Sequence, residues 1–102
     1  MEHRRFKRIK RPFAGVWRGA SRNGECRITD LSAGGCYIQS MAMPAKGEST
    51  VISIDVFGHQ FTFNGRIAYV EQGMGFAVEF TDLPDSERDH LNQLLESPPG
   101  GP

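Results

Sequence analysis

The feature that most constrains the fold is a series of short segments in which apolar and polar residues alternate. Side chains two positions apart point to the same face of a β-strand, so this alternation is typical of half-buried strands. Turn residues separate each segment from the next, and the pattern predicts a mainly β protein, a barrel or a sandwich. Six segments fall within about 70 residues, at 13–18, 25–31, 36–40, 52–56, 61–69 and 76–80.

Two turns and one strand face follow from the same pattern. Asn23-Gly24 is a strong hairpin signal and predicts the turn between the first two strands. Residues 32–35 (SAGG) are expected to break the second strand. In the fifth segment, the apolar residues at odd positions from Phe61 to Tyr69 are expected to share one face.

The chain changes period near its end. Leu91, Leu94 and Leu95 lie at positions i, i+3 and i+4, which form one stripe on a helix. Pro84 suits the first helical turn, and the acidic residues around it favour the positive end of the helix dipole. We therefore expect one helix of about three turns against the barrel. Residues 97–102 (SPPGGP) are expected to be a flexible tail.

Charge is distributed unevenly although the net charge is zero. Nine of the twelve basic residues lie in the first 27 positions, whereas the remaining 75 carry three basic and ten acidic residues. A basic arm, residues 1–11, on a mildly acidic body indicates an anionic partner held at the N-terminus. The alternative is a solvated leader that keeps the protein soluble.

Nothing in the sequence indicates membrane insertion or export. The longest uncharged stretch, Leu31–Ala45, is too short and too polar to span a bilayer. The N-terminus is charged and lacks the apolar segment of a signal peptide, which favours a cytoplasmic protein. Cys26 and Cys36 form no Cys-x-x-Cys pair and are expected to be free, buried thiols.

Two local motifs carry recognisable chemistry. Residues 4–8 (RRFKR) contain Arg-x-x-x-Arg, and residues 30–35 (DLSAGG) contain Asp-x-Ser-x-x-Gly. In an extended segment Asp30 and Ser32 point to the same side, so they present a carboxylate and a hydroxyl together. A carboxylate can accept from the N1–H and N2–H₂ groups of guanine. The planar fork of arginine donates to guanine O6 and N7, or to phosphate.

The two motifs together resemble the signature of PilZ domains. Arg4 and Arg8 match its Arg-x-x-x-Arg, while Asp30, Ser32 and Gly35 match its Asp/Asn-x-Ser-x-x-Gly. The likeness extends over about residues 3–96. It implies a six-stranded antiparallel β-barrel with one C-terminal α-helix, spanning residues 12–96 and binding cyclic di-GMP (c-di-GMP). The ligand contacts expected from the motifs and the resemblance are Arg4, Arg5, Arg8, Asp30, Ser32, Gly34 and Gly35, the two glycines leaving room for a flat base.

The resemblance also implies how such a domain signals. The arm of residues 1–11 would be mobile without ligand and would wrap around c-di-GMP when it binds. The ordered arm would present a new surface to a downstream effector protein. His3 stands where the family has an arginine that goes with a pair of ligands, which favours a single bound ligand, while Arg5 and a protonated His3 leave a pair of ligands open.

Three other functions stay open from the sequence alone. The first is a PilZ-like interaction module without a ligand. The second is a nucleic-acid-binding barrel, which the acidic body and the lack of a basic strand face disfavour. The third is catalysis, which is disfavoured because Ser32 has no recognisable base among the histidines and Gly-x-Ser-x-Gly is absent. The histidines and cysteines show no metal-binding spacing, and no cofactor is expected.

Overall fold

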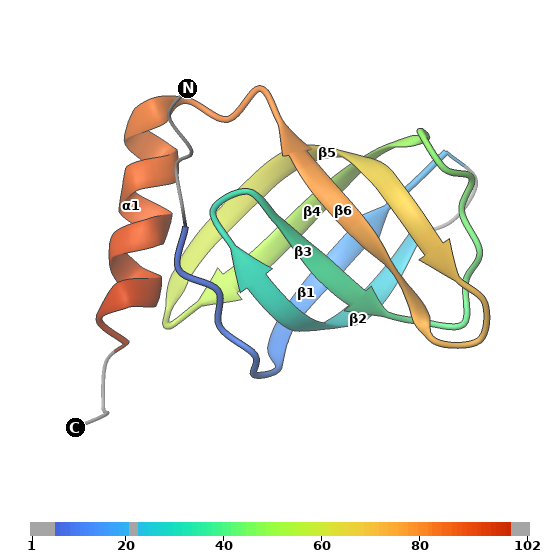
Figure 1. Ribbon diagram of the computed structural model, residues 1–102, viewed down its shortest axis with the longest axis horizontal. Helices are drawn as coiled ribbons and strands as arrows, with labels where there is room; N and C mark the ends of the chain where they lie inside the picture. The colour runs from blue at the N-terminus through green and yellow to red at the C-terminus, as the bar shows by residue number, and fades with distance from the viewer. Residues whose placement is uncertain (1–5, 21–22, 99–102) are drawn as a thin grey trace.

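The chain folds into a closed barrel with a helix at one end. The computed structural model describes residues 6–20 and 23–98. The barrel order is β1-β2-β3-β6-β5-β4, every pair is antiparallel, and β1 closes the ring against β4 (Figure 1). The predicted six-stranded antiparallel barrel with one C-terminal helix is confirmed. The elements are β1 (Phe13–Arg18), β2 (Asn23–Ser32), β3 (Gly35–Gln39), β4 (Ser49–Val56), β5 (His59–Glu71), β6 (Gly75–Thr81) and α1 (Asp85–Glu96).

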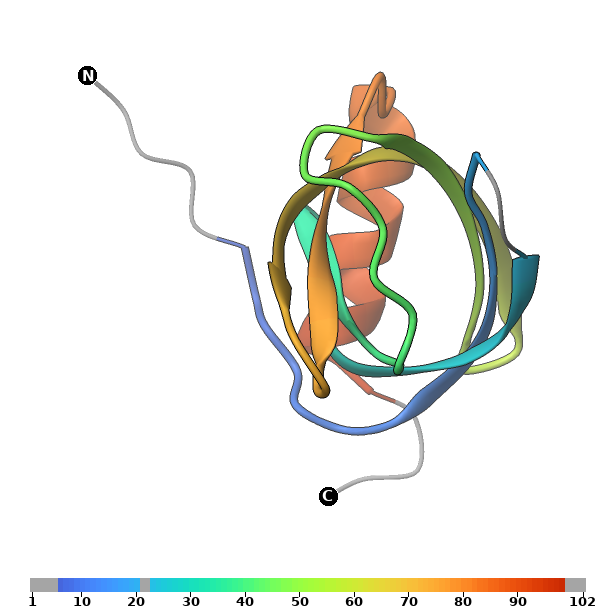
Figure 2. The same ribbon diagram turned by 90° about the vertical axis from the view of Figure 1, so that its right-hand side faces the viewer.

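The core fills the barrel and continues beneath the helix. Figure 2 looks into the ring of strands and shows α1 lying across its far end. Leu91 and Leu95 are fully buried, so the predicted leucine stripe closes that end of the core. Burial of each such side chain stabilises the fold by about 1.5–3 kcal/mol. Alternate strand positions supply most of the rest, among them Ile28, Ile38, Ile52, Ile54, Val56, Phe63, Ile67 and Phe76.

The first hairpin turn differs from its prediction. Asn23 and Gly24 do not form the turn; they belong to β2 and pair with Arg18 and Trp17. A two-residue turn at Asn23-Gly24 would have placed Trp17 opposite Asp30. The observed register instead places Phe13 opposite Ile28, both of them buried. Core packing across the pair therefore outweighs the local turn preference.

The second turn is shorter than expected. β2 continues through Ser32 and β3 begins at Gly35, which leaves Ala33-Gly34 as a two-residue turn. Ala33 is buried in the core. The turn is therefore held close to the barrel, and Ser32 stays in the paired strand.

Tyr69 lies on the opposite face from the one predicted. The β5–β6 register shifts between Ile67 and Tyr69, which is a β-bulge at Ala68. The extra residue reverses the alternation, so Tyr69 is half exposed while Val70 packs against the core. The alternation is correct from Phe61 to Ile67 and fails only after the bulge.

Within residues 6–20 and 23–98, no helix is long and apolar enough to cross a membrane, and no group of three or more His, Cys, Asp or Glu side chains is placed to hold a metal ion.

Both cysteines are free, Cys36 buried and Cys26 half-buried. Burial raises the pKa of Cys26 to about 11 and raises that of Cys36 as well, so both thiols stay protonated at neutral pH.

Candidate functional site

A β-bulge in β2 gives the Asp-x-Ser segment its outward orientation. The β2–β3 register shifts between Ile28 and Asp30, so Thr29 is the extra residue. Without this shift, Asp30 would share the inward face of Ile28. With it, Leu31 is fully buried and Asp30 lies on the outer side of the strand together with Ser32. The bulge thus places a carboxylate at the surface of a strand whose neighbours fill the core.

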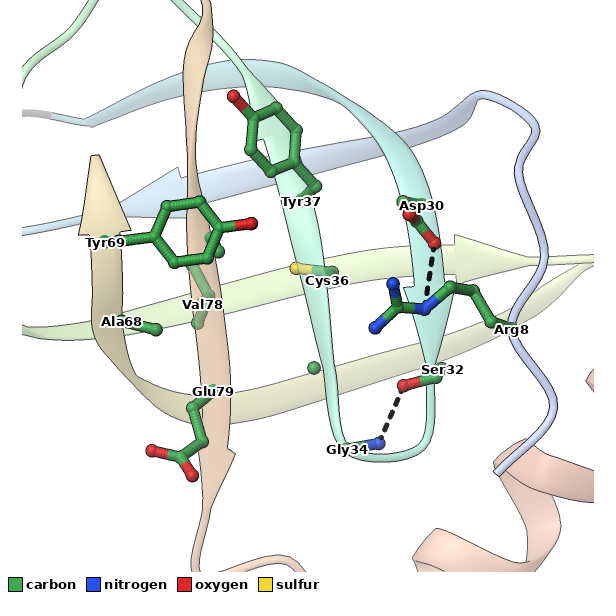
Figure 3. A pocket seen from close by; sticks show the side chains of 12 residues that line it. Arg8, Asp30, Ser32, Gly34, Cys36, Tyr37, Ala68, Tyr69, Val78 and Glu79 are labelled. Carbon is green, nitrogen blue, oxygen red and sulfur yellow. Dashed lines mark hydrogen bonds and ion pairs between the residues drawn. The ribbon is translucent and has the colours of Figure 1, made fainter. Parts of the chain in front are cut away.

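Asp30 and Ser32 border a cavity on the outside of the barrel. The cavity has a volume of about 390 Å³ and lies over β2, β3, β6 and β5, four strands that are consecutive in the barrel (Figure 3). It is lined by both polar and apolar side chains, which suits a ligand with polar edges and flat faces. The lining residues are Arg8, Asp30, Ser32, Gly34, Gly35, Cys36, Tyr37, Ala68, Tyr69, Ala77, Val78 and Glu79.

Arg8 reaches this cavity from the N-terminal segment. Ile9 pairs with Leu31 through two backbone hydrogen bonds of 2.9 and 3.0 Å. The segment before β1 is thus also paired with β2. Next to this pair, Nε of Arg8 lies 3.5 Å from Oδ1 of Asp30. The Arg8 side chain is 65% exposed and that of Asp30 only 22%, so the guanidinium is available to a ligand. An anionic ligand in the cavity would therefore find the Arg8 guanidinium next to the Asp30 carboxylate, which accepts hydrogen bonds.

Asp30 and Ser32 have different roles within the protein itself. Oδ1 of Asp30 is buried and has no hydrogen-bond partner in the described part of the chain. The contact of this oxygen in that part of the chain is the 3.5 Å ion pair with Nε of Arg8. Oγ of Ser32 accepts a hydrogen bond from Gly34 N at 3.2 Å, which caps the turn. Ser32 therefore makes a hydrogen bond within the turn, whereas Oδ1 of Asp30 meets Arg8 in an ion pair without hydrogen-bond geometry.

The two glycines of the motif have close neighbours. A Cβ on Gly35 would lie 2.3 Å from the carbonyl oxygen of Val78, so only glycine lets β3 approach β6 here. A Cβ on Gly34 would lie 3.5 Å from Cδ2 of Phe6, an ordinary contact distance. Glycine is therefore required at position 35 for the packing of β3 against β6, in addition to its predicted role of leaving room for a flat base.

The structure brings together five of the seven predicted site residues. Arg8, Asp30, Ser32, Gly34 and Gly35 all line the cavity. The other two, Arg4 and Arg5, lie outside the described residues.

Sequence reasoning missed the far wall of the cavity. Tyr37 on β3 and Tyr69 on β5 both line it, with ring centroids 6.4 Å apart (Figure 3). Glu79 on β6 lies near them. The two-residue period from Gly35 to Tyr37 could have placed Tyr37 on this face. No sequence signal marks the bulge that turns Tyr69 outward.

Tyr37 is held in place by an acidic partner. Its hydroxyl donates a hydrogen bond of 2.5 Å to Oε1 of Glu71. The bond favours the neutral phenol next to a carboxylate and, with smaller contributions from burial, raises the pKa of Tyr37 to about 12. Because the pKa is raised on folding, this stabilisation is fully present below about pH 10 and is lost as the pH rises toward 12.

Glu71→Ala is expected to return the pKa of Tyr37 toward 10, because it removes the hydrogen bond that holds the proton. Tyr69→Phe leaves Tyr37 as the only tyrosine of the chain, since the sequence contains two. Phenolate absorbance is then titrated in that background with and without Glu71→Ala. Identical midpoints in the two proteins would show that Glu71 does not set the protonation of Tyr37.

A family model and several solved structures match this chain. The model of the PilZ domain matches residues 2–97. A search of curated protein sequences returned no match. The structure of the Bacillus subtilis inhibitor of motility (MotI/DgrA) aligns with a TM-score of 0.80 at 13% identity and covers 94% of this chain and 51% of that one. This chain thus spans about half the length of that protein.

Two structures of YcgR from Escherichia coli are similar as well. YcgR in complex with c-di-GMP aligns with a TM-score of 0.78 at 18% identity, covering 94% of this chain and 46% of that one. The PilZ domain of YcgR with c-di-GMP aligns at 0.72 and 20% identity, covering 94% and 91%. At these identities the structures support the fold. The family model spans nearly every residue of the barrel, the helix and the Arg-x-x-x-Arg segment, and this chain therefore belongs to the PilZ domain family.

Proposed function

We propose that this chain is a c-di-GMP receptor domain that has no catalytic activity and signals through its N-terminal arm. The observation that carries the proposal is the cavity in which Arg8 meets Asp30 and Ser32. These three residues come from two separate motifs and border one space. Family membership and the c-di-GMP complexes among the similar structures support the same ligand.

The chemistry of the cavity suits one guanine and its phosphate. In the proposed complex, the Asp30 carboxylate, which lines the cavity, accepts from guanine N1–H and N2–H₂. The Arg8 guanidinium donates to guanine O6 and N7 or to phosphate. Tyr69, half exposed on the opposite wall, offers an aromatic face for stacking. Arg4 and Arg5 would add positive charge from the same arm.

The proposed signal is ordering of the arm. Residues 1–11 would wrap around the ligand while residues 12–96 stay folded, and residues 97–102 would remain a flexible tail. From residue 6 onward the arm passes along the outside of the barrel (Figure 2), where Lys7 contacts Asn92 of α1 and Ile9 pairs with Leu31 of β2. Its ordering would therefore change the surface on that side of the molecule, which an effector protein can read.

The wild-type protein is expected to bind c-di-GMP, and to bind GMP or cyclic AMP much more weakly. GMP lacks the second nucleotide and its phosphate, to which Arg4 and Arg5 would add contacts, and the adenine of cyclic AMP lacks the N1–H and N2–H₂ donors that Asp30 would accept. Isothermal calorimetry and thermal denaturation measure this. Ligand at about 100 times its Kd adds about 2.7 kcal/mol to the free energy of unfolding. For a chain of this size that raises Tm by roughly 10 °C or more.

The two rival functions give different results in the same experiment. An interaction module without a ligand would show neither heat nor a shift in Tm with c-di-GMP. A nucleic-acid-binding barrel would bind oligonucleotides with an affinity that rises with polymer length and falls steeply with salt. Either outcome would overturn the proposed function.

A further inference from the structure

The cavity-lining Arg8 lies within a segment that is held on both sides. After it, Ile9 pairs with Leu31 through two backbone hydrogen bonds. Before it, the backbone N–H of Lys7 donates to Oδ1 of Asn92 on α1, at 3.0 Å. Lys7 and Asn92 are 85 positions apart in the chain, so this bond joins the two ends of the domain. The position of Arg8 thus depends on contacts made by its neighbours.

Phe6 adds an apolar contact to this arrangement. Its ring is half-buried, packs against the core and lies within van der Waals distance of the space beside Gly34. The guanidinium of Arg88 on α1 lies 6.0 Å from the centre of the ring. Phe6 therefore touches the β2–β3 turn and the helix at once. The ring lies over Gly34 at a distance that would put a Cβ there in ordinary van der Waals contact with it.

We propose that Phe6 and Asn92 form a latch that positions Arg8 for the ligand, with Arg88 as a supporting contact. This inference rests on the proposed c-di-GMP binding. None of the three residues lines the cavity, so they would act through the placement of Arg8. In the latched arm Arg8 already borders the cavity, 3.5 Å from Asp30, which makes the latched state the binding-competent one. The apparent Kd then equals the intrinsic Kd divided by the latched fraction.

Phe6→Ala and Asn92→Ala test the latch because both leave every cavity-lining side chain intact. Asn92→Ala removes the hydrogen bond from Lys7 and also the one that Nδ2 of Asn92 donates to Glu96 within α1. Loss of the bond to Lys7 is expected to raise the Kd for c-di-GMP by about three- to tenfold. Loss of the half-buried ring in Phe6→Ala is expected to raise it by about tenfold. Gln93→Ala is the matched control, since Gln93 is the exposed neighbour of Asn92, and its Kd should stay within about twofold. Asn92→Asp keeps the acceptor oxygen and should recover most of the affinity.

Limited trypsin digestion of the free protein measures the latch without any ligand. The arm contains cleavage sites after Lys7, Arg8 and Lys10. Cleavage of a transiently opened segment follows the population of the open form. Both latch variants should therefore lose the arm faster than the wild type and the Gln93→Ala control.

The possible failures are distinguishable. A lower Tm with unchanged Kd and unchanged cleavage would show that Phe6 and Asn92 only stabilise the fold. Tighter ligand binding in the variants would show that the latch holds the arm away from its binding position. Both results would overturn the inference. If the wild type bound no c-di-GMP, the proposed function would fail, and the digestion would still decide whether a latch exists.

Discussion

Arg8→Ala is expected to weaken c-di-GMP binding by about ten- to a hundredfold while leaving the fold intact. Removing a charge-assisted hydrogen bond costs about 1.5–3 kcal/mol, which corresponds to that loss of affinity. The Arg8 side chain is 65% exposed, and its ion pair with Asp30 spans 3.5 Å. An exposed pair of this kind contributes about 0–1 kcal/mol to stability, so Tm should change little. Calorimetry and thermal denaturation of the same samples measure both quantities.

Two matched variants show whether position matters or only charge. Lys10→Ala removes one positive charge from the same arm, at an exposed residue that does not line the cavity. Its affinity should fall far less. Arg8→Lys keeps the charge and loses the planar fork, so it should bind nearly as poorly as Arg8→Ala if the contact is bidentate. Equal losses in Arg8→Ala and Lys10→Ala would show that the arm acts as a general basic patch.

Asp30→Ala is expected to weaken binding although it makes the cavity more positive. If the cavity only attracted anions, removal of a carboxylate would strengthen binding of a dianionic ligand by relieving repulsion. If Asp30 accepts protons from the guanine edge, its loss should cost about 1.5–3 kcal/mol of binding free energy. Stability should change little, because Oδ1 of Asp30 makes no hydrogen bond among the described residues and its ion pair with the exposed Arg8 contributes about 0–1 kcal/mol.

Glu79→Ala and Ser32→Ala separate the possible roles of Asp30. Glu79 is a second carboxylate on the same cavity, so its removal reports the electrostatic effect alone and should leave binding unchanged or tighter. Ser32→Ala should weaken binding less than Asp30→Ala. It should also lower Tm, because Ser32 Oγ caps the turn at Gly34. A folded Asp30→Ala protein that binds as tightly as the wild type would exclude guanine recognition by Asp30.

Much of the barrel could be predicted because strand burial has a simple period. The inward positions of β4 from Ile52 to Val56 follow a strict alternation in both sequence and structure. The leucines of α1 follow the helical period in the same way. These patterns depend on which side chains leave water, and that is decided mostly by residue type along one element.

The errors lie where two strands must fit each other. Asn23-Gly24 has the local preference of a turn, yet the pairing of Phe13 with Ile28 places it inside a strand. Tyr69 was expected on the same face as Phe61 and Ile67 because the period was extended past Ala68. Both cases are matters of register, which depends on contacts between strands far apart in the chain.

By itself, the sequence determined the class of fold, the helix after the barrel and the motif residues Arg8, Asp30 and Ser32. Tertiary structure alone decided that these residues meet, that Tyr37 and Tyr69 form the opposite wall, and that Phe6 and Asn92 hold the arm. The physical reason is that alternation and motifs are local properties of the chain. The cavity instead depends on two β-bulges, at Thr29 and Ala68, and on an arm that packs against a helix 85 residues away.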